Sequence, residues 1–203
     1  MRTREDAVRF RADIVRNLAR SRPDLQNESG EGFWPIPVMI PVVLAKCIYK
    51  IHEEWLQQIE AGNHETAAML SEVRTRLTHL VAEGDLGEDH AGIYMHEHPN
   101  VKKTKMNSAP FFTAYQAILK EDDPFKLLGF VYSVEAGSLE AVKALVASRM
   151  IANKKFAALH MEEEVEHDRL AEEIKQRIMQ SEYADRFAQG CDLHDALYEN
   201  TVK

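Results

Sequence analysis

Hydrophobic residues recur at steps of three and four along most of the chain, which is the period of an amphipathic helix. Eight segments follow this period, and most of them end at glycine, asparagine or proline. The predicted helices cover residues 3–20, 37–60, 65–83, 88–98, 108–119, 123–150, 153–181 and 183–200. No segment alternates with the period of two that marks a strand. We therefore expect an all-α protein, and a single domain over residues 1–203, because no repeat or linker divides the chain.

Charge and composition narrow the classes of function. The formal net charge of −8 argues against a nucleic-acid partner, because a phosphate-binding surface needs a basic stripe. The arginines of the first helix alternate with acidic residues, and we interpret them as an exposed helix face. No apolar run approaches the roughly 20 residues of a membrane span. Cys47 and Cys191 make no disulfide framework, so we expect a cytoplasmic protein.

The helix predicted over residues 153–181 carries the strongest chemical signal. Its apolar stripe is interrupted by polar residues on the same face, in the order Phe156, His160, Glu164, His167, Ala171, Ile174 and Ile178. Steps of three and four residues stack these side chains above one another. Burying two imidazoles and a carboxylate without partners would cost several kcal/mol. A metal ion supplies the missing partner, so we predict that His160, Glu164 and His167 are metal ligands.

Glu135 is a second anomaly, because it is the only charged residue between Lys126 and Glu140. We expect Leu128, Val131, Leu139 and Val142 to share its helix face. It is either a metal ligand or the partner of a buried arginine or lysine, and such a pair is costly to desolvate. The small residues nearby, Gly129, Gly137 and Ser138, predict a close helix approach or room for a substrate.

A third pair is Glu83, at the end of an apolar helix stripe, and His90, seven residues later. Two helical turns would align them as ligands if the helix resumed in register after the intervening glycines. The alternative is a surface carboxylate and a helix-capping histidine. His79, His96 and His98 compete for the same ligand role.

Together these residues make three carboxylates and three imidazoles, a ligand set that suits iron or manganese better than thiolate-preferring metals. Helix bundles build two-metal sites from such side chains on facing helices, often with a bridging carboxylate. Glu135 and Glu164 are the candidates for the bridge.

The order of these residues resembles the heme-oxygenase-like diiron oxidases and oxygenases. The resemblance rests on Glu83 and His90, on the context of Glu135, and on the run His160-x3-Glu164-x2-His167. It spans roughly residues 70–178. It implies a TenA/PqqC-like bundle of about seven helices, often a homodimer, that holds two Fe(II) ions and uses O2 as co-substrate. Glu164 stands where the family usually has aspartate, and a manganese–iron pair stays open.

The resemblance further implies a small-molecule substrate, with an amino-acid-like metabolite as first expectation, and an external or substrate-derived electron donor. The outcome of oxidation stays open. Tyr132, Gly137 and Phe111 are our candidates for contact with the substrate.

Three other interpretations stay open. A metal-free enzyme of the same fold, such as a TenA-like thiaminase or a PQQ-synthase-like oxidase, would need other pocket residues, for example a cysteine. Cys47 lies in an apolar context and is interpreted as a core thiol. A ferritin-like metal-binding protein should show Glu-x2-His in two helices. A helical interaction module without chemistry would tolerate apolar residues at His160, Glu164 and His167.

Overall fold

A computed structural model describes residues 4–27, 35–81, 90–99 and 109–200. These residues form nine α-helices and one short 3-10 helix, and no strand occurs among them. The all-α prediction is therefore confirmed for the described part of the chain. The helix count of nine differs from the seven that the family resemblance implied. No described helix is long and apolar enough to cross a membrane.

The helix bounds follow the hydrophobic period closely. The elements are α1 Arg4–Ser21, η1 Pro23–Leu25, α2 Pro35–Glu60, α3 His64–Val81, α4 His90–Glu97, α5 Ala109–Lys120, α6 Pro124–Glu135, α7 Ser138–Ala147, α8 Lys155–Met179 and α9 Ala184–Glu199. Asp123 caps α6, because its side chain accepts hydrogen bonds from the backbone N–H groups of Phe125 and Lys126 at 2.9 and 3.3 Å. Pro124 occupies the first turn, where its missing N–H costs nothing.

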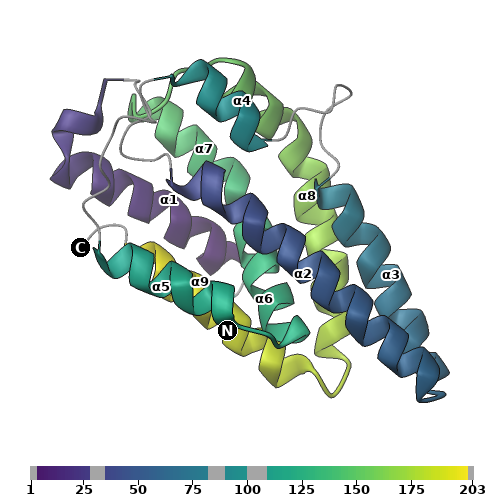
Figure 1. The fold of residues 1–203 in the computed structure, drawn as a ribbon. Coiled ribbons are helices and arrows are strands. Elements are labelled where there is room, and N and C mark those ends of the chain that lie inside the picture. Colours follow the sequence, from purple (N-terminus) through teal and green to yellow (C-terminus); the bar gives the residue numbers. More distant parts are fainter. Residues whose placement is uncertain (1–3, 28–34, 82–89, 100–108, 201–203) are drawn as a thin grey trace.

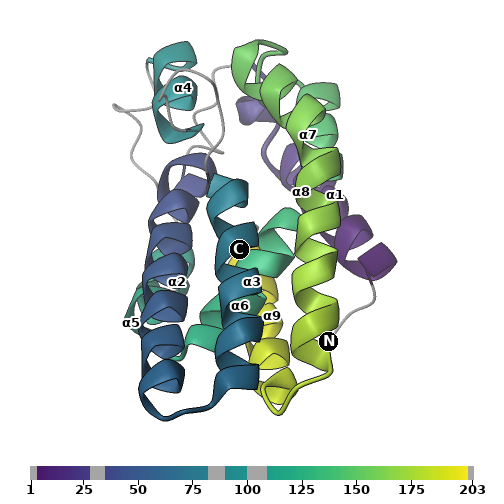
Figure 2. The same ribbon diagram turned by 90° about the vertical axis from the view of Figure 1, so that its right-hand side faces the viewer.

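The central helix is α6, which α2, α8 and α9 surround (Figures 1 and 2). Every residue of α6 from Leu127 to Glu135 is buried. Gly129 and Gly190 let α6 and α9 approach closely, since a Cβ at either position would overlap a backbone carbonyl oxygen of the other helix. Although glycine is unfavourable inside a helix, Gly190 lies within an unbroken α9, where it allows this contact.

One predicted helix is wrong. The segment 123–150 forms two helices, because the chain turns at Ala136 and Gly137. The Gly137 N–H donates to Glu135 O at 2.7 Å, which closes α6, and α7 then packs against α1 and α8. Leu139 and Val142, which we expected on the face of Glu135, therefore belong to the next helix.

Two apolar clusters form the core, and both use α8. Phe156 and Ala157, near the start of α8, belong to the cluster around α1 and α7. The later stripe from Leu170 to Ile178 belongs to the cluster around α6. The stretch of α8 between these two clusters carries the polar residues that the sequence singled out. In Figure 2, α8 runs alongside α3, with which it is in contact.

Candidate metal centre

Three polar side chains of α8 face the interior. His160, Glu164 and His167 are buried, while Glu162 and Glu166 between them are exposed. The steps of four and three residues along α8 put the buried three on one stripe. The spacing predicts a solvated face for the other acidic residues of this helix; Glu162 and Glu166 are exposed, whereas Glu163 and Asp168 are half-buried.

Glu135 meets this stripe from α6. It is the last residue of that helix and is buried, and the turn at Ala136 and Gly137 follows it directly. The capped start of α6 and its close glycine contact with α9 hold the helix in place, so the position of Glu135 is set by packing along the whole helix.

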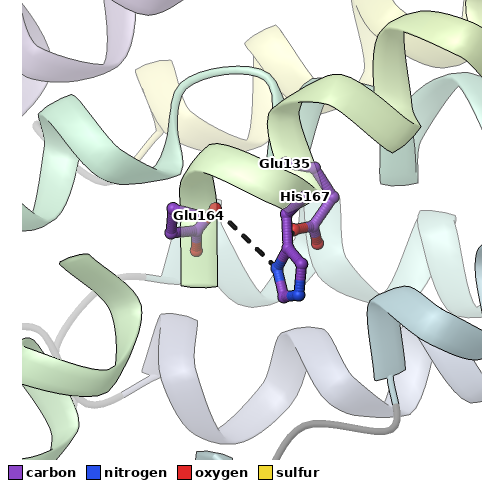
Figure 3. Close-up of side chains that lie close together, drawn as sticks. All are labelled: Glu135, Glu164 and His167. Atoms are coloured by element: carbon purple, nitrogen blue, oxygen red, sulfur yellow. Dashed lines mark ion pairs between the residues drawn. The ribbon is translucent and has the colours of Figure 1, made fainter. Parts of the chain in front are cut away.

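Glu135, Glu164 and His167 form a compact cluster, which we call the carboxylate–histidine cluster (Figure 3). His167 Nδ1 lies 3.5 Å from Glu135 Oε2 and 4.0 Å from Glu164 Oε2. Each of the three residues offers one ligand atom, and these atoms lie within 4.8 Å of one another. These separations are longer than ordinary hydrogen bonds, and an ion between the three groups would satisfy them together.

Two buried carboxyl groups side by side disfavour a second negative charge. Burial first, and then the charge of the nearby Glu135, raise the pKa of Glu164 to about 8, against a lowering by a hydrogen bond from Ser138. Within the part of the chain that the structure describes, Glu164 Oε2 is buried and has no hydrogen-bond partner. A buried carboxylate oxygen without a donor is costly, and a bound cation would remove that cost.

His160 lies one turn before Glu164. Its Nδ1 lies 2.9 Å from the Phe156 carbonyl oxygen, so Nδ1 carries the proton and the lone pair of the neutral ring is on Nε2. Burial lowers the pKa of His160 to about 4, although Glu135 acts in the opposite direction. The ring is therefore neutral at pH 7, which is the form that binds metals.

Sequence reasoning missed Arg11, which we interpreted as part of an exposed helix face. It is only 4% exposed. Its guanidinium donates to the Val134 carbonyl oxygen and to the Tyr198 hydroxyl, the latter at 3.0 Å. The spacing held a signal, because Arg11 lies three residues after Val8 and four before Val15 on the apolar stripe of α1. Arg11 ties the end of α6, next to Glu135, to α1 and α9.

The other predicted ligands are not placed. Glu83 lies outside the described residues, and His90 begins α4 with a side chain that is not described. Their ligand role stays a prediction. Of the competing histidines, His98 is buried and its ring is tilted against Tyr94 at 4.5 Å between centroids, whereas His79 and His96 are exposed.

The three substrate candidates lie in different places. Gly137 lies in the turn that follows Glu135. The Tyr132 hydroxyl donates to Glu172 at 3.2 Å, which directs it along α8 beyond the cluster. Phe111 is fully buried on α5, where its ring stacks with Tyr115 in the apolar core. Gly137 is linked to the cluster through its backbone hydrogen bond to Glu135, and substrate contact by any of the three stays a prediction.

A surface pocket of about 300 Å³ reaches His167. Its lining comes from α3 and α8 and consists of His79, Glu163, Glu166, His167, Arg169 and Leu170. Arg169 forms ion pairs with Glu166 and Glu173 at the rim. The pocket gives a small polar molecule or an ion a path from solvent to an imidazole of the cluster.

The donor set fits a hard or borderline cation. Two carboxylates with imidazole nitrogen suit iron or manganese, while a thiolate-preferring metal would need cysteine. Both cysteines lie in the core: burial raises the pKa of Cys191 to about 11 and that of Cys47 beyond the usual range. This bears out the interpretation of Cys47 as a core thiol. Comparison with protein-family models, curated proteins and solved structures gives no match for the chain.

Proposed function

We propose that this chain is an O2-dependent oxidoreductase with a heme-oxygenase-like bundle, which binds two iron ions between its helices and oxidises a small metabolite. The observation that supports it is the buried carboxylate–histidine cluster, in which Glu164 Oε2 has no hydrogen-bond partner among the described residues. A site built for stability alone would replace such a group with an apolar residue or give it a donor.

The proposed ligands divide between two ions. His160, Glu164 and His167 would hold one, and Glu135 would be shared with a second. Glu83 and His90 would complete the second ion's ligands. Bound iron supplies the one-electron chemistry that reaction with O2 requires. The chain's own residues bind the ions, burial keeps His160 neutral, and the apolar clusters on both sides limit the access of bulk water.

The pocket beside His167 supports a small polar substrate. Its volume of about 300 Å³ is at the lower end of ligand pockets in proteins. Glu163 favours a group with positive charge. Arg169 is ion-paired with Glu166 and Glu173, so the carboxylate of an amino-acid-like metabolite would bind there in exchange for one of these partners.

Iron counting tests the proposal. Metal-free protein is loaded with ferrous iron under argon, excess iron is removed, and bound iron is counted per chain. We expect about two irons per chain, and a sharp loss in Glu164→Gln. Glu162→Gln is the matched control, because Glu162 is exposed on the same helix two residues away. If the protein retains neither iron nor manganese, the proposal is wrong, and a metal-free enzyme of the same fold takes its place.

Repeated addition of iron in air separates an enzyme from a storage protein. A diiron enzyme stops at about two irons per chain and consumes O2 faster when its substrate is present. A ferritin-like protein continues to accumulate iron, and that result would replace the oxidoreductase proposal with metal storage.

A further inference from the structure

A second apolar stripe runs along the outer face of α2. Six large hydrophobic side chains are exposed in the described residues, and four of them lie on this helix. Their relative exposures are 52% for Val42, 59% for Tyr49, 43% for Leu56 and 43% for Ile59. Ala45, also exposed, and the half-buried His52 lie between them on the same line. We call these six residues the α2 seam.

The seam has the spacing of a coiled coil. Its positions 42, 45, 49, 52, 56 and 59 advance by alternating steps of three and four residues, the a and d positions of a heptad. An ordinary surface helix has one apolar stripe, which faces the core. In α2 the stripe through Val43, Cys47 and Ile51 already does this, since all three are fully buried. The seam is additional to the packing within the chain, because its four large hydrophobic side chains are exposed although α2 packs against α3, α4 and α6 (Figure 1).

We propose that two copies of the chain associate through the α2 seam, with the two α2 helices antiparallel about a two-fold axis. This proposal is independent of the proposed function, because none of the seam residues belongs to the metal centre.

When a second copy of α2 runs in the opposite direction, the residues of the seam face one another in pairs. An axis midway between residues 50 and 51 places each position opposite another seam position, since the two numbers of each pair sum to 101. The facing pairs are Val42 with Ile59, Ala45 with Leu56, and Tyr49 with His52. A small residue thus faces a large one, and an aromatic ring faces an imidazole, which is the size alternation that lets two helices interdigitate.

Charge at the edges of the seam selects the antiparallel direction. Lys46 and Lys50 border its N-terminal half, where their ammonium groups lie 3.3 and 3.5 Å from Asp122, and Lys50 also pairs with Glu53 of its own chain at 3.0 Å. Glu53 and Glu60 border its C-terminal half. An antiparallel pair brings the lysines of one copy beside the glutamates of the other, whereas a parallel pair would bring like charges together.

The seam is short. From Val42 to Ile59 it rises about 26 Å along the helix axis at 1.5 Å per residue. An interface centred on one helix pair is at the small end of specific interfaces. We therefore expect a reversible dimer with a dissociation constant of about 1–100 μM, near the weak end of the affinity scale.

Sedimentation across a concentration series tests the dimer. The full chain should shift from monomer to dimer as its concentration rises. Leu56→Glu should move the midpoint at least about tenfold to higher concentration, because the change occurs twice in a two-fold interface. Val165→Glu is the matched control, since Val165 is 65% exposed on α8, outside the seam, and should leave the midpoint unchanged. A chain that stays monomeric at all concentrations, or a dimer that Leu56→Glu does not weaken, overturns the proposal.

Disulfide trapping tests the direction and does not depend on Leu56→Glu remaining folded. Val42→Cys and Ile59→Cys proteins are prepared separately, mixed and oxidised gently. The native thiols Cys47 and Cys191 are buried, which limits their reaction. The antiparallel pairing predicts that the mixed disulfide forms faster than either homodimer. A homodimer of Val42→Cys that forms faster than the mixed species would indicate a parallel or random encounter and contradict the proposed pairing.

Discussion

Replacing Glu164 by glutamine should stabilise the metal-free protein, and more strongly as pH rises. Burial raises the pKa of Glu164 from 4.5 to about 8. The folded state therefore holds a proton that the unfolded state releases between these values, and stability falls as pH increases. Each pH unit in this window costs about 1.4 kcal/mol. The loss from Glu164 reaches about 1 kcal/mol at pH 5 and about 3 kcal/mol at pH 7. Glutamine has the shape of the protonated acid and avoids this loss.

Urea unfolding of metal-free protein at pH 5 and pH 7 measures the effect. The free energy of unfolding of Glu164→Gln, relative to the unchanged chain, should rise by about 2 kcal/mol between the two pH values. His160 titrates in the same range, but its contribution cancels in this difference because it is present in both proteins. Glu162→Gln, at an exposed position on the same helix, should show no comparable rise. An equal difference at both pH values would mean that Glu164 is ionised in the folded protein, and the reasoning on its burial would be wrong.

Three further changes probe the surroundings of the centre. The pKa of His160 is lowered to about 4, so its contribution to the stability of metal-free protein falls as pH drops from 6.5 towards 4, opposite in sign to that of Glu164. The free energy of unfolding of His160→Gln in urea, relative to the unchanged chain, should therefore rise over this range. Arg11→Met should lower the free energy of unfolding by about 1–3 kcal/mol, because it leaves two buried oxygen acceptors without their donor. The control Arg9→Met, at an exposed position, should change it by less than about 0.5 kcal/mol. Equal effects of the two changes in thermal melts would refute the role assigned to Arg11. Gly190→Ala should cost about 3 kcal/mol or more by forcing α9 away from α6, and an unchanged melting temperature would contradict the close contact.

The helices were predictable because most of them have one polar face. The period of three and four residues can be read wherever solvent and core alternate, as in α8, where exposed Glu162 and buried Glu164 are only two residues apart. The break between α6 and α7 was not predictable in this way. Nearly every position from Phe125 to Ser138 is buried, so apolar and polar residues do not alternate there with a helical period. A turn within such a segment therefore cannot be recognised from the hydrophobic pattern.

The residues of the candidate metal centre likewise fall into those that the sequence could group and those that it could not. Residues on a single helix could be grouped from spacing alone, which is why His160, Glu164 and His167 were found together. The approach of Glu135 depends on how α6 packs against α8, and the burial of Arg11 depends on a contact across 123 residues of chain. Arg11 lay on the apolar stripe of α1, but the many other arginines of that helix favoured the interpretation of an exposed face.

The most direct test of the metal centre is a crystal structure of the protein loaded anaerobically with ferrous iron, with anomalous diffraction measured at the iron absorption edge. The account predicts two anomalous peaks, one within bonding distance of Glu164 and His167 and both within bonding distance of Glu135. Peaks confined to surface carboxylates, or a proton shared between Glu135 and Glu164 with no ion beside them, would contradict it.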